Sequence, residues 1–221
     1  MIAFATAITS TTVYAEIALP GIERAAESDS VILTRSGYDS IQQPYNEMMD
    51  EAASLPGLEA LVLLHQDLEL LDDSLPRRVR EVFADPRVGL TGPLGGCISK
   101  PHCWLWPDVA YGTVDPQAGR GPVVGSEEVD AVDGALLVLA PWAVRGLRFG
   151  EGLSELFHGY DVDIGLRVGV RGGKVICHDL PCHHRREIKD DYEGQQLAGI
   201  ALARMWDPTL RPEAWIPAFQ S

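Results

Sequence analysis

Basic residues are scarce in this chain, which has 18 lysines and arginines against 32 aspartates and glutamates and a formal net charge of −14. Binding to a nucleic-acid backbone or to an anionic membrane needs a basic face. The charge balance therefore argues against both kinds of partner. A phosphorylated ligand would also be repelled, unless a cation or local arginines screened the negative charge.

Long apolar runs and basic N-terminal residues are also missing. No stretch approaches the roughly 18 apolar residues of a membrane-spanning helix. A secretory signal begins with a basic segment, but no Lys or Arg precedes Arg24. We therefore expect a cytoplasmic protein without an integral membrane segment. The four cysteines form no CxxC pair, and we expect them to be reduced thiols: Cys97, Cys103, Cys177 and Cys182.

Apolar strand-like segments alternate with helix-like segments in the first 92 of the 221 residues. This alternation predicts an α/β domain whose parallel sheet carries helices on both faces. Residues 92–126 are rich in Gly and Pro and show little periodicity. We expect strands at 2–8, 30–34, 61–64, 88–91, 129–139 and 174–177, and helices at 13–27 (bent or broken at Pro20), 40–53 (capped by Ser40), 74–83, 141–144, 161–171 and 191–206.

Two acids directly follow the most apolar of these strands. Four consecutive aliphatic residues, 61–64, are typical of a strand buried on both faces, and Asp67 and Glu69 come where it leaves the sheet. Ligands of open α/β sheets bind outside the carboxyl ends of the strands. An acid-x-acid pair at that place suits a hard divalent cation serving a phosphorylated ligand. A solvated loop with two ordinary surface acids explains the same residues equally well.

A second group of acids lies near glycines later in the chain. Asp161 and Asp163 begin a predicted helix after a glycine-containing loop. Asp161 could project into a cleft as a general base, although Asp is also a favoured capping and first-turn residue. Asp133 and Gly134 lie at the edge of an apolar strand. A turn there, or a ligand approaching the glycine backbone, would explain them.

Histidines follow the last predicted strand, in the segment ICHDLPCHHRR at 176–186. Since histidine is the commonest neutral metal ligand, His183 or His184 could complete a cation site begun by the acids after residue 64. Zinc held by Cys177, Cys182 and these two histidines is an alternative. Their spacing, however, matches no paired zinc-ligand pattern.

Taken together, HQDLEL after a buried strand, then VDAVDGALLVLAP, then FHGYDVDIGLRVGVRGGKVICHDLPCHH resemble the glycosyltransferase-like branch of the family 2 nucleotide-sugar transferases. The resemblance covers about residues 2–186. It implies a single GT-A domain over 1–221, with a Rossmann-like, mixed and mostly parallel sheet flanked by helices. It also implies a nucleotide-binding half at 1–92, an acceptor and metal half at 93–190, and a C-terminal helix and tail at 191–221.

The resemblance further implies a metal-assisted, inverting transfer of a sugar from a nucleotide diphosphate donor, expected to be UDP-linked, to a hydroxyl acceptor. Asp67 and Glu69, joined by His183 or else His184, would bind Mn²⁺ or Mg²⁺ and the donor diphosphate. Asp161 would be the base that deprotonates the acceptor. Contacts to donor and acceptor are expected from Asp133, Gly134, Asp163, Trp104 and Trp106.

The chain departs from the family pattern at two places. Tyr160 stands where the first of two paired acids is expected, and the metal motif reads D-x-E. One alternative is therefore a nucleotide-sugar-binding module that has lost transfer activity, with Tyr160 as its sign. A small zinc-binding protein is another alternative. The third is an interaction protein that uses Trp104 and Trp106 as an adhesive patch.

Overall fold

A computed structural model describes residues 1–98, 109–115, 125–150, 153, 157–185 and 191–206 of the chain. The strands are β1 (Ile2–Ile8), β2 (Val31–Ser36), β3 (Ala60–Leu64), β4 (Leu68–Leu70), β5 (Val88–Gly92), β6 (Leu94–Cys97), β7 (Val109–Gly112), β8 (Ser126–Val129), β9 (Ala131–Val132), β10 (Leu136–Leu139), β11 (Lys174–His178) and β12 (Cys182–His184). The helices are α1 (Thr11–Val13), the π-helical η1 (Tyr14–Ala18), α2 (Leu19–Ala25), α3 (Gln42–Ala53), α4 (Leu75–Val82), α5 (Pro141–Gly146), α6 (Tyr160–Val170) and α7 (Tyr192–Trp206). None of the helices in this part of the chain has the length and apolar character that crossing a membrane requires.

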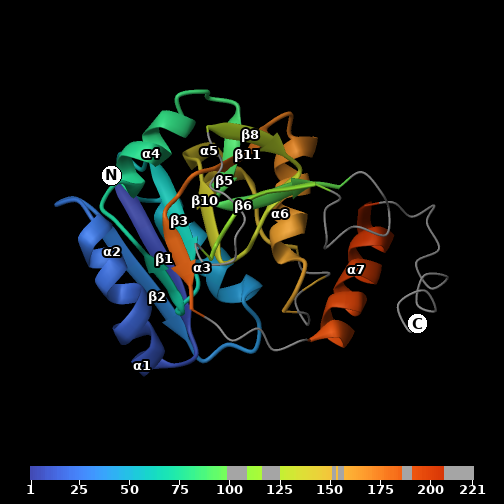
Figure 1. The fold of residues 1–221 in the computed structure, drawn as a ribbon, viewed down its shortest axis with the longest axis horizontal. Helices are drawn as coiled ribbons and strands as arrows, with labels where there is room; N and C mark the ends of the chain where they lie inside the picture. The colour runs from blue at the N-terminus through green and yellow to red at the C-terminus, as the bar shows by residue number, and fades with distance from the viewer. Residues whose placement is uncertain (99–108, 116–124, 151–152, 154–156, 186–190, 207–221) are drawn as a thin grey trace.

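A seven-stranded sheet in the order β2-β1-β3-β10-β5-β11-β8 forms the centre of the molecule (Figure 1). β1 pairs in parallel with β2 and β3, and β5 pairs in parallel with β11, whereas β10 and β8 run antiparallel to their neighbours. The predicted mixed and mostly parallel sheet is therefore confirmed. β2 and β3 lie on opposite sides of β1, so the strand order reverses there. The carboxyl ends of these strands are the favoured ligand position in such a sheet.

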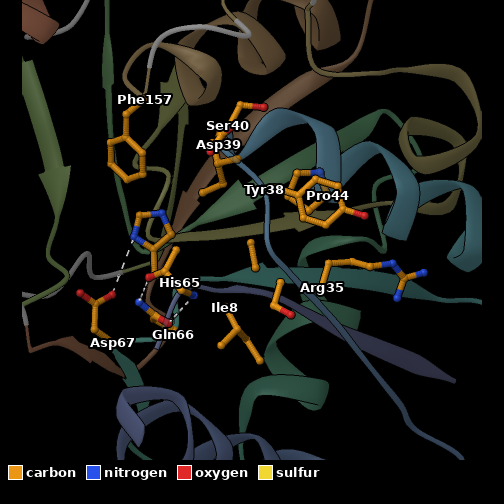
Figure 2. Close-up of a pocket in the computed structure, with 14 residues that line it drawn as sticks. Ile8, Arg35, Tyr38, Asp39, Ser40, Pro44, His65, Gln66, Asp67 and Phe157 are labelled. Carbon is orange, nitrogen blue, oxygen red and sulfur yellow. Dashed lines mark hydrogen bonds and ion pairs between the residues drawn. The ribbon is translucent and has the colours of Figure 1, made fainter. Parts of the chain in front are cut away.

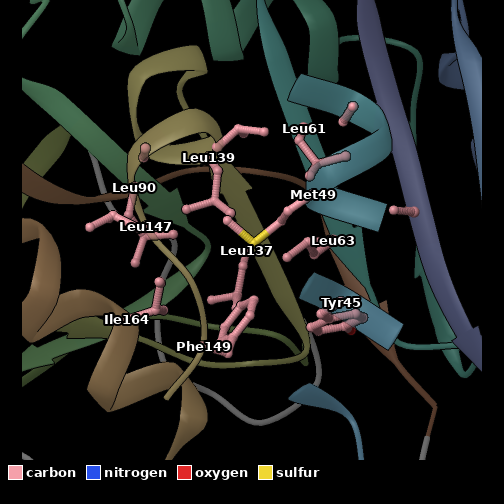
Figure 3. Close-up of a cluster of buried hydrophobic side chains, with 14 of the residues drawn as sticks. Tyr45, Met49, Leu61, Leu63, Leu90, Leu137, Leu139, Leu147, Phe149 and Ile164 are labelled. Carbon is pink, nitrogen blue, oxygen red and sulfur yellow. The ribbon is translucent and has the colours of Figure 1, made fainter. Parts of the chain in front are cut away.

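Two hydrophobic cores cover the two faces of this sheet. Leu61 and Leu63 of β3 belong to the core beneath α3, α5 and α6, part of which is drawn in Figure 3. Val62 and Leu64 belong to the opposite core, beneath η1, α2 and α4. Alternate side chains along a strand point to opposite faces of the sheet, and both faces are covered here. Every residue of β3 is therefore buried, as the aliphatic run predicted.

Two predicted helix boundaries differ from the structure. The helix expected at 13–27 continues through Pro20, because the preceding turn is π-helical and the N–H of Leu19 bonds to the carbonyl of Tyr14. Pro20, which lacks an N–H, is the second residue of α2 and directly follows the place where the hydrogen bonds change from the π-helical to the α-helical pattern. The prediction that Ser40 caps the next helix was wrong. That helix begins at Gln42, and Ile41 precedes it without a side-chain cap.

The glycine-rich middle of the chain contains strands that the sequence pattern did not reveal. β6 pairs with β7 and β9 in a small antiparallel sheet. A Cβ on Gly95 of β6 would lie 2.7 Å from the carbonyl oxygen of Ala131, so the close approach of the two backbones requires glycine and removes the alternation that normally signals a strand. The strand expected over 129–139 is divided into β9 and β10 by a turn, in which Asp133 Oδ1 accepts the N–H of Ala135 at 2.9 Å.

Helix α6 packs so closely on β9 that one of its glycines has no room for a methyl group. A Cβ on Gly165 would lie 2.5 Å from the carbonyl oxygen of Asp130, whereas one on Gly169 of the same helix would meet nothing within 4 Å. We expect Gly165→Ala to lower the free energy of unfolding by about 1–3 kcal/mol in urea titrations, the usual effect of overpacking. Gly169→Ala is the matched control and should raise that free energy by about 0.5–1 kcal/mol. Equal stability of the two variants would contradict this packing.

Candidate functional site

A cleft of about 300 Å³ opens at the carboxyl ends of β1, β2 and β3 (Figure 2). His65, Asp67 and Phe157 lie at one end of it, and Arg35 and Tyr38 lie at the other. The full lining consists of Ala7, Ile8, Thr9, Arg35, Ser36, Tyr38, Asp39, Ser40, Ile41, Pro44, His65, Gln66, Asp67 and Phe157. The cleft therefore lies where the strand order predicts a ligand.

Three side chains beside this cleft form a group that could hold a metal ion. One ligand atom from each of His65, Asp67 and His184 lies within 4.8 Å of the others. His184 Nε2 is 3.2 Å from Asp67 Oδ1, and His65 Nδ1 is 4.0 Å from the same oxygen. Imidazole and carboxylate ligands in one group suit a divalent first-row metal.

The carboxylate of this group is held in its charged form. Burial alone would raise the pKa of Asp67, but the hydrogen bond from His184 and the nearby charge of both histidines bring the pKa below its usual value. A metal ligand must be deprotonated. Asp67 therefore meets that requirement at neutral pH.

Backbone pairing brings the distant residue His184 to the segment after β3. β12 pairs antiparallel with β4, so His184 lies opposite Leu68, and the N–H of Arg185 donates to the carbonyl of Asp67 at 2.9 Å. Gln66, which lies between His65 and Asp67 in the sequence, connects the segment after β3 to the loop after β1. Its Oε1 accepts the N–H groups of Thr9 and Ser10 at 2.9 and 2.8 Å.

Two residues that the sequence analysis expected in the metal site lie outside this group. Glu69 Oε2 accepts a hydrogen bond from Arg185 Nε at 2.7 Å and forms an ion pair with Nη2 of the same guanidinium at 2.5 Å. His183 Nε2 lies 3.7 Å from Asp115 Oδ1. Since His183 and His184 are neighbours in a strand, their side chains point to opposite faces, and it is His184 that faces Asp67.

His65 was not among the metal ligands expected from the sequence. It is the first residue after β3 and precedes Asp67 by two positions. The spacing of the expected Asp67-x-Glu69 motif is therefore also present two residues earlier, as His65-x-Asp67. That spacing, together with a residue type that often binds metals, was the available signal.

Asp161 lies against the turn between β9 and β10. Its Oδ2 accepts the N–H of Gly134 at 3.0 Å, and its Oδ1 accepts the N–H of Val162 at 2.9 Å. Burial and, to a smaller extent, the negative charge of Asp133 raise the pKa of Asp161 to about 6, against the opposing effect of these backbone hydrogen bonds. A carboxylate with a pKa near the working pH suits a general base.

Tyr160 connects Asp161 to the group formed by His65, Asp67 and His184. Its hydroxyl is 2.7 Å from His65 Nε2 and donates to the carbonyl of Gly134 at 3.1 Å. Only 3% of the residue is exposed to solvent. Asp161 does not line the cleft, and its connection to His65 runs through Gly134 and Tyr160.

Asp163, the other acid of this helix, joins three elements of the fold. Its Oδ2 accepts from Arg167 Nε at 2.7 Å and from the N–H of Gly150 at 3.1 Å. Its Oδ1 accepts from Trp206 Nε1 of α7 at 3.0 Å. The carboxylate is fully buried, and these contacts give it an architectural role. The other expected substrate contacts, Trp104 and Trp106, lie outside the described residues.

The residues of the zinc alternative are not brought together. The Cys177 thiol donates to the carbonyl of Tyr111 at 3.3 Å from within the large sheet, whereas Cys182 lies in the separate β4–β12 pair. The potential metal-binding groups among the described residues include neither of them. Cys97, Cys177 and Cys182 are free thiols, as the sequence predicted; Cys103 lies outside the described residues.

Comparison with solved structures shows which fold this is. GalNAc-T7, solved with UDP, GalNAc and Mn²⁺, superposes with a TM-score of 0.64 at 12% identity, over 94% of this chain and 48% of that one. The mannosyltransferase PcManGT from Pyrobaculum calidifontis, solved with GDP-Man and Mn²⁺, gives 0.57 at 13% identity, over 97% and 69%. Likenesses at such low identity show the fold alone, and that fold is GT-A, as predicted.

Comparison of sequences shows the family. Streptomycin biosynthesis protein StrF from Streptomyces griseus is 32% identical over 197 residues, and the match spans 83% of this chain and 66% of that protein. The chain thus covers slightly less than two thirds of this relative. A family model described as "Glycosyltransferase like family" matches residues 3–199. This chain therefore belongs to the glycosyltransferase-like family and has the GT-A fold.

Proposed function

We propose that this protein transfers a sugar from a nucleotide diphosphate donor to a hydroxyl acceptor, with the help of a divalent metal held by His65, Asp67 and His184. The observation that carries the proposal is the convergence of these three side chains beside a cleft at the carboxyl end of β3. When bound, the metal would supply positive charge to the leaving diphosphate. At a net charge of −14, such a cation would also screen the repulsion of an anionic donor.

The two ends of the cleft suit the two parts of the donor. His65 and Asp67 at one end would hold the metal and the diphosphate, which leaves the end near Arg35 and Tyr38 for the nucleoside. Two structural neighbours were solved with UDP or GDP-Man, each together with Mn²⁺. On the motif resemblance we propose a UDP-linked donor and Mn²⁺ or Mg²⁺ as the metal.

Asp161 is proposed as the base that removes the proton of the acceptor hydroxyl. The N–H groups of Gly134 and Val162 orient its carboxylate, and its pKa of about 6 leaves it charged at neutral pH. Asp133 supplies the neighbouring negative charge that an acid at position 160 would have supplied. Direct attack by the deprotonated hydroxyl would invert the configuration of the sugar carbon. Since Asp161 lies outside the cleft lining, the acceptor would approach from a different side than the nucleotide.

A nucleotide-sugar-binding protein without transfer activity is the second candidate. The observation that favours it is Tyr160, which stands where an acid is expected and whose hydroxyl contacts His65 and Gly134. Metal-dependent binding of nucleotide sugars, with neither transfer nor slow donor hydrolysis, would support this candidate.

His184→Ala should weaken donor binding and His183→Ala should not. The measurement is the thermal shift produced by a panel of UDP-sugars and GDP-sugars, with Mn²⁺ and with a chelator, because a ligand of the folded state raises the midpoint. We expect at least about a 10-fold loss of Mn²⁺-dependent affinity in His184→Ala, since it removes a ligand. His183→Ala is the matched control on the opposite face of β12. Loss in His183→Ala alone would contradict this metal site.

Asp161→Asn should abolish most transfer while leaving nucleotide binding intact. Asn keeps an oxygen that can accept the N–H of Gly134, so the fold should survive. The rate of sugar transfer should fall by about 10²–10⁴-fold, which is the usual contribution of a general base. Nucleotide affinity of the same preparation serves as the control. Wild-type transfer rates in Asp161→Asn would show that Asp161 is a structural residue only.

Asp161 also makes stability depend on pH in the metal-free protein. Its pKa of about 6 in the folded state exceeds the value of about 3.9 expected for an unfolded chain. The folded state therefore binds the proton of the Asp161 carboxyl more tightly than the unfolded state does. The stabilisation from this proton is fully present below about pH 4 and is lost as the pH rises through about 6. We expect the free energy of unfolding of the wild type, relative to Asp161→Asn, to fall between pH 4 and pH 7 in urea titrations with chelator. A constant difference would refute the raised pKa.

A further inference from the structure

Tyr160 is the residue at which the chain departs from the paired-acid pattern, and proton removal by Asp161 gives it no role. Its ring is packed against Tyr45 at 6.1 Å and Phe149 at 5.8 Å, both edge to face. A Cβ on Gly134 would overlap its hydroxyl, so the approach of this hydroxyl to the Gly134 backbone requires glycine. The hydroxyl is therefore held in one place, between a backbone carbonyl and the ring of His65.

The two contacts of this hydroxyl favour one of the two nitrogens of His65 as the one that carries a proton. The carbonyl of Gly134 can only accept, so Tyr160 uses its single proton in that contact, at 3.1 Å. With the proton of Tyr160 used in this way, the second contact, at 2.7 Å, is a hydrogen bond when His65 Nε2 is the donor. In a neutral imidazole with a proton on Nε2, the lone pair is on Nδ1.

The nitrogen left with the lone pair is the one that faces the metal-binding group. His65 Nδ1 lies 4.0 Å from Asp67 Oδ1, and the ring of His65 meets that of His184 edge to face at 5.4 Å between centroids. A carboxylate oxygen is also an acceptor. His65 Nδ1 and Asp67 Oδ1 are then two acceptors that face each other at 4.0 Å, and a cation bound between them would stabilise this arrangement.

We propose that Tyr160 is a positioning residue that fixes His65 in the Nε2–H tautomer and thereby prepares its Nδ1 to bind the metal. This inference rests on the metal site of the proposed function and adds to it a residue that touches neither metal nor donor. Partners of this kind orient ligating histidines and set their tautomer, and their loss typically costs about 10–100-fold in metal affinity. Tyrosine at position 160 is then a support of the site and not a sign of lost activity.

The test compares Tyr160→Phe with the wild-type protein in two measurements that need no catalysis. The first is the ¹⁵N–¹H correlation spectrum of the histidine rings in metal-free protein at about pH 8, where His65→Ala identifies the His65 signals among the six histidines. We expect the Nε2–H tautomer in the wild type and its loss or mixing in Tyr160→Phe. The second is the dissociation constant of Mn²⁺ alone, measured by calorimetry or by the spectrum of free Mn²⁺, which should rise by about 10–100-fold.

Tyr45→Phe is the matched control. Tyr45 is fully buried, its ring touches that of Tyr160, and its hydroxyl has no hydrogen-bond partner among the described residues. This variant removes the same atom from the same aromatic cluster and should leave both measurements unchanged. A double-mutant cycle then separates positioning from general damage. In the His65→Ala background, Tyr160→Phe should have no further effect on Mn²⁺ affinity.

The outcomes distinguish this inference from the proposed function on which it rests. If the wild type binds no Mn²⁺, the metal site is wrong and both fail. If the wild type binds Mn²⁺ and a folded Tyr160→Phe binds it equally well, the inference alone fails. The same holds if wild-type His65 carries its proton on Nδ1, or if Tyr160→Phe weakens Mn²⁺ binding by the same factor with and without His65.

Discussion

The peptide backbone around Gly134 bonds to three residues of the candidate site, which are Asp161, Tyr160 and His65. The N–H of Gly134 donates to Asp161, its carbonyl accepts from Tyr160, and the next carbonyl, that of Ala135, accepts the N–H of His65 at 3.0 Å. A side chain at position 134 would push Tyr160 away, so these contacts can exist together only with glycine. The end of β3, the turn before β10 and the start of α6 are thus fixed relative to one another by a single turn of the chain.

The pKa values of two partly buried carboxylates near this turn, Asp67 and Asp161, are shifted in opposite directions by their neighbours. Burial is the largest influence on both, but histidines around Asp67 outweigh it and lower the pKa, whereas Asp133 adds to it at Asp161 and raises the pKa. Titratable groups whose environments separate their pKa values in this way usually have different chemical roles. The two roles proposed for Asp67 and Asp161, a charged metal ligand and a carboxylate that exchanges a proton, agree with these opposite pKa shifts.

The sequence predicted the sheet and the edge at which the candidate site lies, but not that His65 and His184 would lie beside Asp67. The aliphatic run before His65 predicted β3 and the position of a ligand at its end, because burial on both faces has a simple pattern. Which side chains then converge depends on the pairing of β12 with β4, and no local pattern in either segment encodes that register. Acidic spacing therefore favoured Glu69, although its carboxylate is occupied by Arg185. Likewise, the strand β6 could not be predicted from its sequence, because its glycines give no alternation of apolar and polar residues. Its close contact with β9 is made by the backbone.

The antiparallel strand β10 has a consequence for how the chain folds. β1, β2 and β3 can pair soon after they are made, but the partner of Leu64 on the other edge of β3 is Leu136, and β5 joins the sheet only through β10. Contacts between such distant segments slow folding, because a long loop must close before they form. During synthesis on the ribosome, the apolar edge of β3 stays open to wrong partners until residue 139 has emerged. The strand order therefore leaves newly made chains with an unpaired apolar edge from the synthesis of β3 to that of β10.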